Sequence, residues 1–349
     1  MLESGKQLPT IRDYAGMLLP AKAPIDHVDV SSHGLVTGAP DDWCAVRFQT
    51  ENAGERWALM PGPEFSPRVY RGQNKRYERT VASLFRQANE TEWFAASVQI
   101  LEFGLYVMNH PGTVTITERT IGGLKGFVDW TAQGQHYGIP TEYLDVTRNR
   151  EVAEFFARCR PTVDSDPTQP WEVVPESGYD AVLYTVDLKQ LINSSDSDIV
   201  APMGPSPLPR AYRQAAAGLR LKGTDFCSLP SVTQEMLPYS RERAETLLTQ
   251  FEGGAFLFPN DGLSRIARAI LTDKIFTADA VKAARRMVGR PFSLSEISTR
   301  LSKAGYRIIK TQPKIDANLF NCLRAEWDEM ATEYDSRIKW RWTSSHYVQ

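Results

Sequence analysis

The chain has 349 residues, of which 42% are hydrophobic and 23% are charged, and its formal net charge is −2. This length and composition predict a folded protein with a large core, in one large domain or two modest ones, and exclude a wholly disordered chain. The near-neutral charge argues against a globally basic nucleic-acid binder and leaves a local basic surface open.

The cysteines and the hydropathy pattern bear on the cellular setting. The N-terminus lacks the apolar region of a signal peptide, and no segment approaches the ~18 apolar residues that a membrane span needs. We therefore expect a cytoplasmic protein with reduced thiols, no membrane partner and no metal site. The four cysteines form neither a C-x-x-C pair nor a Cys/His metal spacing, and they are Cys44, Cys159, Cys227 and Cys322.

The first 65 residues predict a small β-rich extension. Short extended segments at 27–30, 44–48 and 57–60 alternate with Pro and Gly turns. Apolar residues at three- and four-residue spacing then predict helices between Glu78 and His110.

The segment from Gln135 to Thr141 concentrates unusual polar chemistry. Gly138 and Pro140 interrupt it, so the sequence predicts a rigid turn that presents polar side chains. Residues 143–147 alternate in polarity, which predicts a strand with its polar face toward a cleft.

A helix is predicted over residues 151–157, where Val152, Phe155 and Phe156 form an apolar stripe. Thr147 or Asn149 is the expected N-cap, because short polar side chains there accept the first free amides.

The second half of the chain predicts mixed elements. Strands are expected at 181–186 and 255–258, helices over most of 263–287 and over 317–334, and a mobile loop or linker from Ser194 to Pro209. A capping box formed by Ser293 and Glu296 predicts a helix that ends near Gly305.

Several common catalytic motifs are missing from the sequence. It contains no G-x-G-x-x-G turn, no Walker A loop, no H-E-x-x-H and no G-x-S-x-G. The sequence therefore argues against a Rossmann dinucleotide-binding protein, a P-loop nucleotide-binding protein, a zinc protease and a serine hydrolase.

Two blocks together resemble the FRG domain family, which is named for an (F/Y)-R-G motif. Residues 69–73 read V-Y-R-G-Q, and residues 135–157 resemble the family's Q-H-x-G-x-P-T-R-L-L-D-W-T followed by A-x-F-F-A. The chain departs from this pattern at Glu142, where the family usually has Arg, and at Val146, where it usually has Trp.

The FRG family is known mainly as an uncharacterised bacterial and phage-associated domain, and its motif order is similar to that of ADP-ribosyltransferases. The resemblance implies an α+β fold whose core is a mixed or antiparallel split β-sheet with packed helices. It also implies an FRG domain over residues 66–275, between a β-rich extension at 1–65 and a helical C-terminal region at 276–349. The Q-x-E sequence of Gln250 and Glu252 would supply the late motif.

The resemblance also assigns roles to individual residues. It implies catalytic roles for Arg71, Gln250 and Glu252, in which the guanidinium binds pyrophosphate or ribose and the carboxylate stabilises charge at the anomeric carbon. The residues expected to bind the cofactor, NAD as a substrate, are Tyr70, Gly72, His136, Tyr137, Thr141, Tyr143, Asp145 and Thr147.

Alternative readings remain for several of these residues. Asp145 and Thr147 are equally suited to holding the turn and capping the helix. A second candidate for the late motif runs from Arg210 to Gln214, with Gly218 after a longer gap. The basic and aromatic tail at 337–342 fits an end strand better than a nucleic-acid grip.

The primary hypothesis is therefore an ADP-ribosyltransferase-like enzyme that cleaves NAD and transfers ADP-ribose to a protein, a nucleic acid or water. The family's setting suggests a toxin or phage-defence effector, with an inhibitor or partner protein. A non-catalytic module that binds a nucleotide or a protein is the alternative, and a nuclease is the third, although no acidic cluster at recognisable spacing supports it.

Overall fold

The computed structural model describes residues 8–18, 43–61, 68–163, 168–194, 199–201, 206–288, 293–310, 317–337 and 340–341. The helices are α1 (Ile11–Met17), α2 (Glu90–Asn109), α3 (Pro111–Glu118), α4 (Trp130–His136), α5 (Arg150–Arg158), α6 (Leu188–Ser194), α7 (Pro209–Arg213), α8 (Arg241–Gln250), α9 (Gly262–Thr272), α10 (Ala278–Val288), α11 (Leu294–Lys303) and α12 (Ala317–Arg337). Short 3₁₀ turns occur at Ser83–Arg86, Phe226–Ser228 and Glu252–Gly254.

The strands fall into one large sheet and several small ones. The large sheet contains β3 (Arg68–Gln73), β6 (Tyr143–Thr147), β9 (Val182–Asp187), β10 (Val200–Ala201), β11 (Ala216–Arg220) and β12 (Val232–Met236). The small sheets contain β1 (Trp43–Thr50), β2 (Gly54–Pro61), β4 (Thr120–Ile121), β5 (Leu124–Lys125), β7 (Cys159–Pro161), β8 (Trp171–Val173), β13 (Ile275–Thr277), β14 (Arg307–Ile309) and β15 (Trp340–Arg341).

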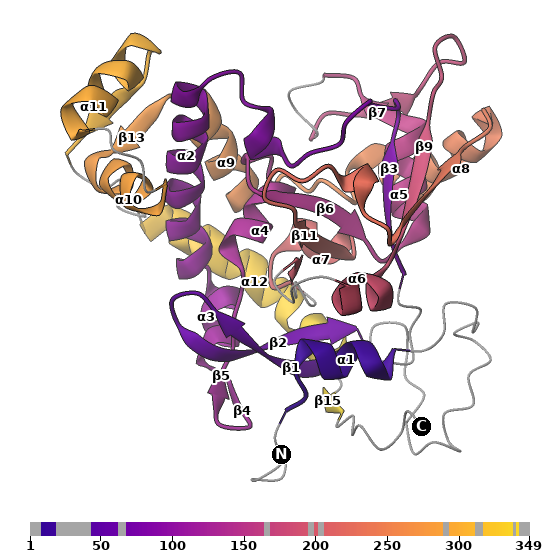
Figure 1. The fold of residues 1–349 in the computed structure, drawn as a ribbon, viewed down its shortest axis with the longest axis horizontal. Helices are drawn as coiled ribbons and strands as arrows, with labels where there is room; N and C mark the ends of the chain where they lie inside the picture. The colour runs from indigo at the N-terminus through magenta and orange to yellow at the C-terminus, as the bar shows by residue number, and fades with distance from the viewer. Residues whose placement is uncertain are drawn as a thin grey trace.

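The large sheet has the order β10-β11-β6-β3-β9-β12, and every neighbouring pair is antiparallel (Figure 1). Its two central strands are joined unequally to their neighbours. β3 pairs with β9 along its whole length, from Arg68 to Gln73, whereas it pairs with β6 only through Tyr70 and Thr147. The sheet is therefore split between β3 and β6 beyond that single pair.

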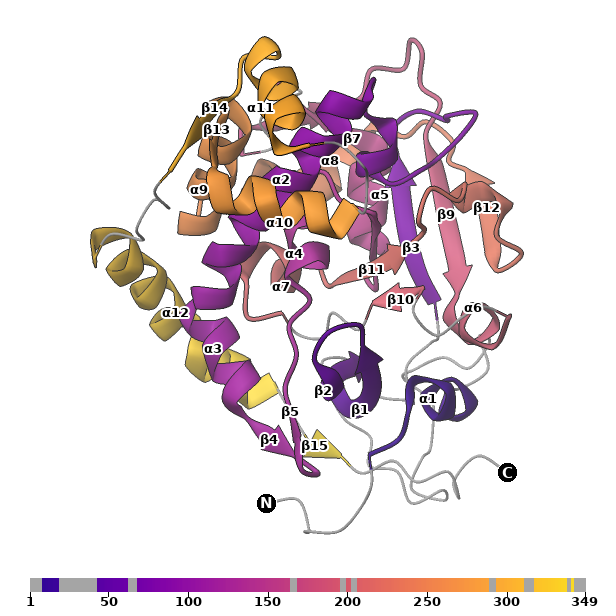
Figure 2. The same ribbon diagram turned by 60° about the vertical axis from the view of Figure 1, so that its left-hand side comes forward.

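Helix α5 lies against β3 on one side of the sheet (Figure 2). Gly72 permits this approach, because a Cβ atom at residue 72 would clash with the backbone oxygen of Ala153. The opposite face of the sheet packs on the N-terminal elements through an apolar cluster that includes Val69, Leu144 and Val146.

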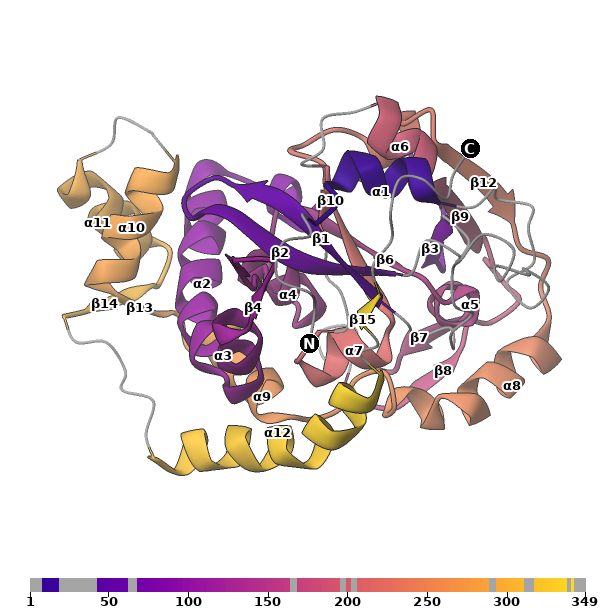
Figure 3. The same cartoon turned by 90° about the horizontal axis from the view of Figure 1, so that it is seen from below.

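Helices form a second layer beside the split sheet. α2 contacts α4, α9 and α10, and α12 contacts α3 and α9 along one side of the molecule (Figure 3). The N-terminal hairpin of β1 and β2 pairs with β15, so the two ends of the described chain meet in one small sheet. The protein is a mixed α+β fold with an antiparallel central sheet.

Several predicted elements are confirmed. β6 and β9 occupy the predicted strands at 143–147 and 181–186, and α5 covers residues 151–157 with Asn149 as its N-cap. Ser293 caps α11 by accepting the amide of Glu296, and α12 covers the predicted C-terminal helix.

Other predictions were wrong. Gln135 and His136 belong to the last turn of α4, because Asp129 caps that helix and it ends only at His136, followed by Tyr137 as C-cap and by Gly138 with a φ of +80°. Residues 255–258 form turns in place of a strand, since amides at 256–258 bond to carbonyls three to five residues back. Residues 81–85 form only a loop and a 3₁₀ turn before α2.

Two predictions fall partly or wholly on residues that are not described. The strand at 27–30 lies outside the described residues. The predicted loop at 194–209 is described only in part, where it contributes β10 and the start of α7. Within the described residues, no helix is long and apolar enough to cross a membrane.

The contact between β3 and α5 gives a direct test of the fold. We expect Gly72→Ala to lower the free energy of unfolding by about 2 kcal/mol or more, because the new methyl group overpacks the backbone of α5. Gly16→Ala is the control, since no atom lies within 4 Å of a Cβ at this exposed position in α1, and it should be neutral or stabilising. Urea denaturation measures both variants, and equal stability of the two would contradict the account.

Candidate functional site

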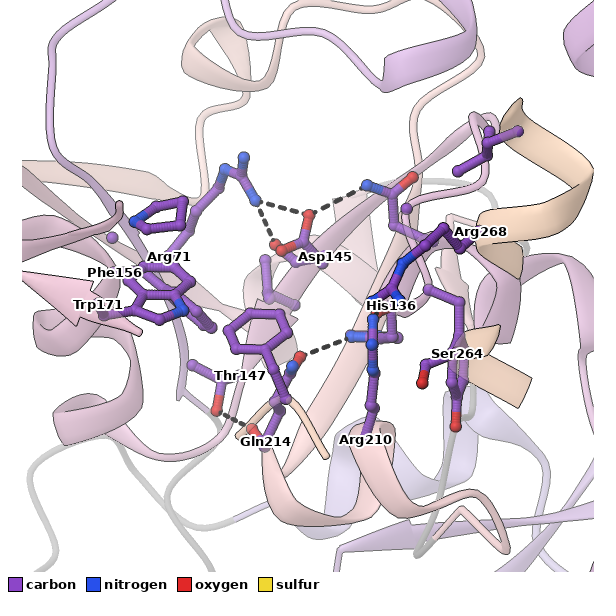
Figure 4. Close-up of a pocket in the computed structure, with 18 of the residues that line it drawn as sticks. Arg71, His136, Asp145, Thr147, Phe156, Trp171, Arg210, Gln214, Ser264 and Arg268 are labelled. Atoms are coloured by element: carbon purple, nitrogen blue, oxygen red, sulfur yellow. Dashed lines mark hydrogen bonds and ion pairs between the residues drawn. The ribbon is translucent and has the colours of Figure 1, made fainter. Parts of the chain in front are cut away.

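A cavity of about 520 Å³ lies where the split sheet meets α4, α7 and α9 (Figure 4). Its volume falls in the usual range for small-molecule sites. It is lined by Tyr70, Arg71, Gly72, Gln135, His136, Tyr137, Gly138, Asp145, Val146, Thr147, Phe156, Pro161, Trp171, Arg210, Gln214, Phe258, Ser264, Arg268, Leu271 and Thr272.

Arg71 bridges the split between β3 and β6. One terminal nitrogen of its guanidinium donates to Asp145 Oδ1 at 2.8 Å and to the backbone carbonyl of Asp145 at 2.7 Å. The single β3–β6 pair, Tyr70 with Thr147, lies just before this point. The side chain thus closes the gap that backbone hydrogen bonds leave open, while the strands splay to form the cavity.

Asp145 is held in its ionised form. Burial alone would raise the pKa of this carboxyl, but the charge of Arg71, the hydrogen bond from Arg71 and, at the acid pH where the carboxyl titrates, the charge of protonated His136 outweigh it and lower the pKa to about 2. Gln135 adds a longer contact, with its amide nitrogen 3.4 Å from Asp145 Oδ1. The carboxylate therefore stays negative throughout the physiological pH range.

Positive charge exceeds negative charge around the cavity. Its described lining contains three guanidinium groups, on Arg71, Arg210 and Arg268, and one carboxylate, on Asp145. Arg210 is buried over the ring of Tyr137, with the guanidinium 4.9 Å from the ring centroid. This excess favours an anionic ligand.

Aromatic rings form one wall of the cavity. Trp171 and Phe258 stack with centroids 5.2 Å apart and an interplanar angle of 15°, and Phe156 packs against both. In Figure 4, Phe156 and Trp171 lie across the cavity from His136 and Arg268. Flat apolar rings opposite cationic side chains suit a ligand that carries both an aromatic group and negative charge.

His136 is tied to Gln214 inside the wall. His136 Nδ1 lies 2.9 Å from Gln214 Oε1, and the amide nitrogen of Gln214 donates to the backbone carbonyl of Leu257 at 3.0 Å. Burial is the main cause that lowers the pKa of His136 below its ordinary value. The imidazole is therefore neutral at pH 7.

Some residues predicted to bind a cofactor instead use their hydroxyl groups in hydrogen bonds within the protein. Thr147 lines the cavity, but its hydroxyl donates to the backbone carbonyl of Gln214 at 2.6 Å and so ties β6 to α7. Thr141 donates to Gln135 at 3.0 Å, and Tyr143 donates to Asp129 at 2.6 Å. Neither Thr141 nor Tyr143 is among the residues that line the cavity.

Tyr70, Gly72 and Tyr137, by contrast, do line the cavity as expected. The hydroxyl of Tyr137 donates to Asp261 at 3.0 Å, and the ring packs beside Phe103 with centroids 5.3 Å apart. Burial raises the pKa of Tyr137 well above its usual value, so the phenol stays protonated. Only its ring face is left to meet a ligand.

Gln250 and Glu252 are not brought to the cavity. Both side chains are exposed, and Gln250 ends α8 with its amide donating to Glu151 at 2.7 Å. Glu252 opens the following 3₁₀ turn with a φ of +52°. Neither residue is among those that line the cavity with Arg71, and α8, which carries Gln250, packs against α5. Their catalytic roles have no support from the geometry.

The second candidate for the late motif reaches the cavity instead, through Arg210 and Gln214. Sequence reasoning missed several further lining residues, among them Trp171, Phe258 and Arg268. Trp171 follows a Pro- and Asp-rich segment, and Phe258 lies in a stretch that reads as a strand. Arg268 lies on the polar side of an amphipathic helix, so no local signal set these three apart.

The Arg71–Asp145 ion pair predicts a pH-dependent stability. The pKa of Asp145 in the folded protein lies below its ordinary value of 3.8, so the pair stabilises the fold above about pH 4 and this contribution is lost as the pH falls toward 2. Allowing for partial exposure, we expect Asp145→Asn to lower the free energy of unfolding by about 1–2 kcal/mol at pH 7, and by much less near pH 2.

Urea denaturation at both pH values measures this effect. Asp328→Asn, an exposed aspartate on α12, is the control and should change stability little at either pH. A loss in Asp145→Asn that is the same at pH 7 and pH 2 would contradict the prediction.

Comparisons with known proteins bear on the same region. The FRG domain model matches residues 66–166, which hold β3, α4, β6 and α5 and therefore Arg71, His136 and Asp145. No curated protein and no solved structure matches the chain. Residues 66–166 of this chain therefore belong to the FRG domain family.

Proposed function

We propose that the cavity binds a nucleotide and that its substrate is NAD, whose nicotinamide–ribose bond the protein cleaves to pass ADP-ribose to a macromolecule or to water. One observation carries the proposal. Among the described residues, three guanidinium groups and a single carboxylate line one cavity together with a wall of stacked aromatic rings. A dinucleotide has the matching chemistry, because it joins a pyrophosphate to two aromatic bases.

The arginines suit the pyrophosphate. A guanidinium presents a planar fork of donors that matches phosphate oxygens better than an ammonium does. Arg71 uses one terminal nitrogen on Asp145, and the other end of its guanidinium points away from that carboxylate in Figure 4. Arg268 projects from α9 on the opposite side of the cavity.

Asp145 is the group best placed to assist bond cleavage. When the nicotinamide–ribose bond breaks, the bonding electrons leave with nicotinamide and positive charge develops at the anomeric carbon of the ribose. A fixed, ionised carboxylate stabilises that charge. Asp145 takes the place that the sequence suggested for Glu252, because it is the one carboxylate among the described residues lining the cavity.

The cavity also bears on the extent of the functional unit. Its lining begins at Tyr70 and ends at Thr272, although the family model stops at residue 166. We therefore propose that residues 66–275 act as one FRG unit, with 1–65 and 276–349 as additions. The split sheet and the order Arg71, Asp145, Gln214 support the likeness to ADP-ribosyltransferases.

We also propose an acceptor and a biological role for the protein. A protein or nucleic-acid acceptor, a role as a toxin or phage-defence effector, and control by an inhibitor or partner protein all follow from the family's motif order and setting.

A non-catalytic nucleotide-binding module is the second candidate. One observation favours it: Asp145 is already engaged by Arg71 at 2.8 Å, which reduces the charge available to a reaction centre. Such a module would use the same arginines and aromatic wall, so turnover is what separates the two proposals.

Binding and turnover can be measured on the same preparation. Calorimetry with NAD and with ADP-ribose should show binding, and Arg268→Met should weaken it about tenfold, because a charge-assisted hydrogen bond to phosphate is lost. Arg265→Met is the matched control. Arg265 lies three residues earlier on α9, is also exposed, and is not among the lining residues.

Labelled NAD then distinguishes the enzyme from the module. The enzyme releases nicotinamide, and Arg71→Ala should lose that activity. Binding without release supports the module. Failure of both ligands to bind, or equal binding by the Arg268→Met and Arg265→Met variants, would overturn the nucleotide site, and release unchanged in Arg71→Ala would overturn the catalytic account.

A further inference from the structure

His136 holds a buried nitrogen that the fold leaves without a partner. The residue is 7% exposed and forms part of the cavity wall, and its Nε2 atom has no hydrogen-bond partner among the described residues. A buried polar atom without a partner costs about 1–3 kcal/mol. Such groups are rare in folded proteins and call for a functional or ligand-based explanation.

Gln214 determines which nitrogen of His136 carries the proton. The amide nitrogen of Gln214 donates to the carbonyl of Leu257, and a carbonyl can only accept. The amide oxygen of Gln214 must therefore face His136 Nδ1, 2.9 Å away, and it accepts a hydrogen bond from that nitrogen. Nδ1 is thus protonated in the neutral ring.

The neutral ring then carries its lone pair on Nε2. Burial favours the neutral form most strongly, the charge of Arg210 favours it further, and the charge of Asp145 together with the hydrogen bond to Gln214 opposes it. Arg210 lies on α7, Gln214 directly follows that helix, and Asp145 lies on β6. The net effect is a pKa below the ordinary value, so Nε2 is an acceptor at pH 7.

We propose that His136 Nε2 accepts the proton of the hydroxyl group that attacks the ribose, and that Gln214 is the positioning residue that holds His136 in the required tautomer. This role rests on the proposed cleavage of NAD. The acceptor oxygen forms a bond to the anomeric carbon, the carbon–nitrogen bond breaks with its electrons going to nicotinamide, and the hydroxyl proton moves to Nε2. The imidazolium later returns that proton to solvent.

The assignment names a class of acceptor. A neutral imidazole of lowered pKa suits water or an alcohol, whose oxygen lone pair is free before the proton leaves. It does not suit a lysine side chain, whose ammonium has no lone pair at pH 7. The structure thus favours water or a hydroxyl group of a macromolecule as the acceptor.

Nuclear magnetic resonance of the ring nitrogens tests the tautomer in the intact protein. The chain has five histidines, and the signal lost in His136→Gln identifies His136. We expect the neutral Nδ1–H form at pH 7 and a titration midpoint below 6.5. Finding the Nε2–H form, or a ring that is charged at pH 7, would overturn the proposal.

Gln214→Glu tests the positioning role. A carboxylate beside Nδ1–H should raise the pKa of His136 by about one pH unit or more. In the pH profile of kcat/KM for nicotinamide release, the acid limb should move to higher pH by the same amount. Gln190→Glu is the matched control, since Gln190 is exposed on α6 and does not line the cavity, and it should leave both the midpoint and the profile unchanged.

The outcomes separate this inference from the proposed function. If NAD is cleaved but the pH profile of kcat/KM does not follow the pKa of His136, the role of His136 is rejected and the NAD reaction stands. If Gln214→Glu fails to fold, the tautomer and the titration midpoint of His136 in the unmodified protein still test the proposal. If NAD is not cleaved at all, the reaction is rejected together with the part given to His136.

Discussion

The bridge from Arg71 to Asp145 is the interaction on which the site depends. β3 and β6 are neighbours in the central sheet, yet only Tyr70 and Thr147 are in register. Beyond them the strands separate, and the guanidinium of Arg71 spans the gap to both the carboxylate and the carbonyl of Asp145. A split in a sheet normally leaves unpaired polar groups, which are costly when buried. Here the gap between the two strands borders the cavity. The guanidinium of Arg71 satisfies part of the polar edge of β6 by donating to the carbonyl and the carboxylate of Asp145.

The surrounding residues keep that opening in shape and give it chemistry. Gly72 lets α5 approach β3, Thr147 ties β6 to the end of α7, and Gln214 fixes His136. The site therefore combines an immobilised framework with three kinds of group that line the cavity: the arginines, the neutral imidazole and the stacked aromatic rings. Residues from the Y-R-G motif serve both purposes, since Arg71 lines the cavity while Gly72 packs the helix behind it.

The sequence anticipated the parts of the site that are local in the chain. β6, α5 and the Asn149 cap follow from alternation, helical periodicity and a short polar side chain. Arg71, His136 and Asp145 were all singled out, and the family match covers the segment that holds them. What the sequence could not provide was the convergence of distant segments. The sequence favoured Glu252 as the late motif and kept Gln214 second. In the structure Gln214 lines the cavity, whereas Glu252, which follows α8, does not. Trp171, Phe258 and Arg268 reach the site from segments with no motif of their own.

A crystal structure with ADP-ribose bound is the measurement that tests the central claim most directly. ADP-ribose lacks the nicotinamide that would be cleaved, so its binding does not depend on turnover. The account predicts density in the cavity, with the diphosphate within hydrogen-bond distance of the guanidinium of Arg71, Arg210 or Arg268 and an aromatic base against the wall formed by Phe156, Trp171 and Phe258. An empty cavity at saturating ADP-ribose, or the ligand bound at another surface, would contradict it.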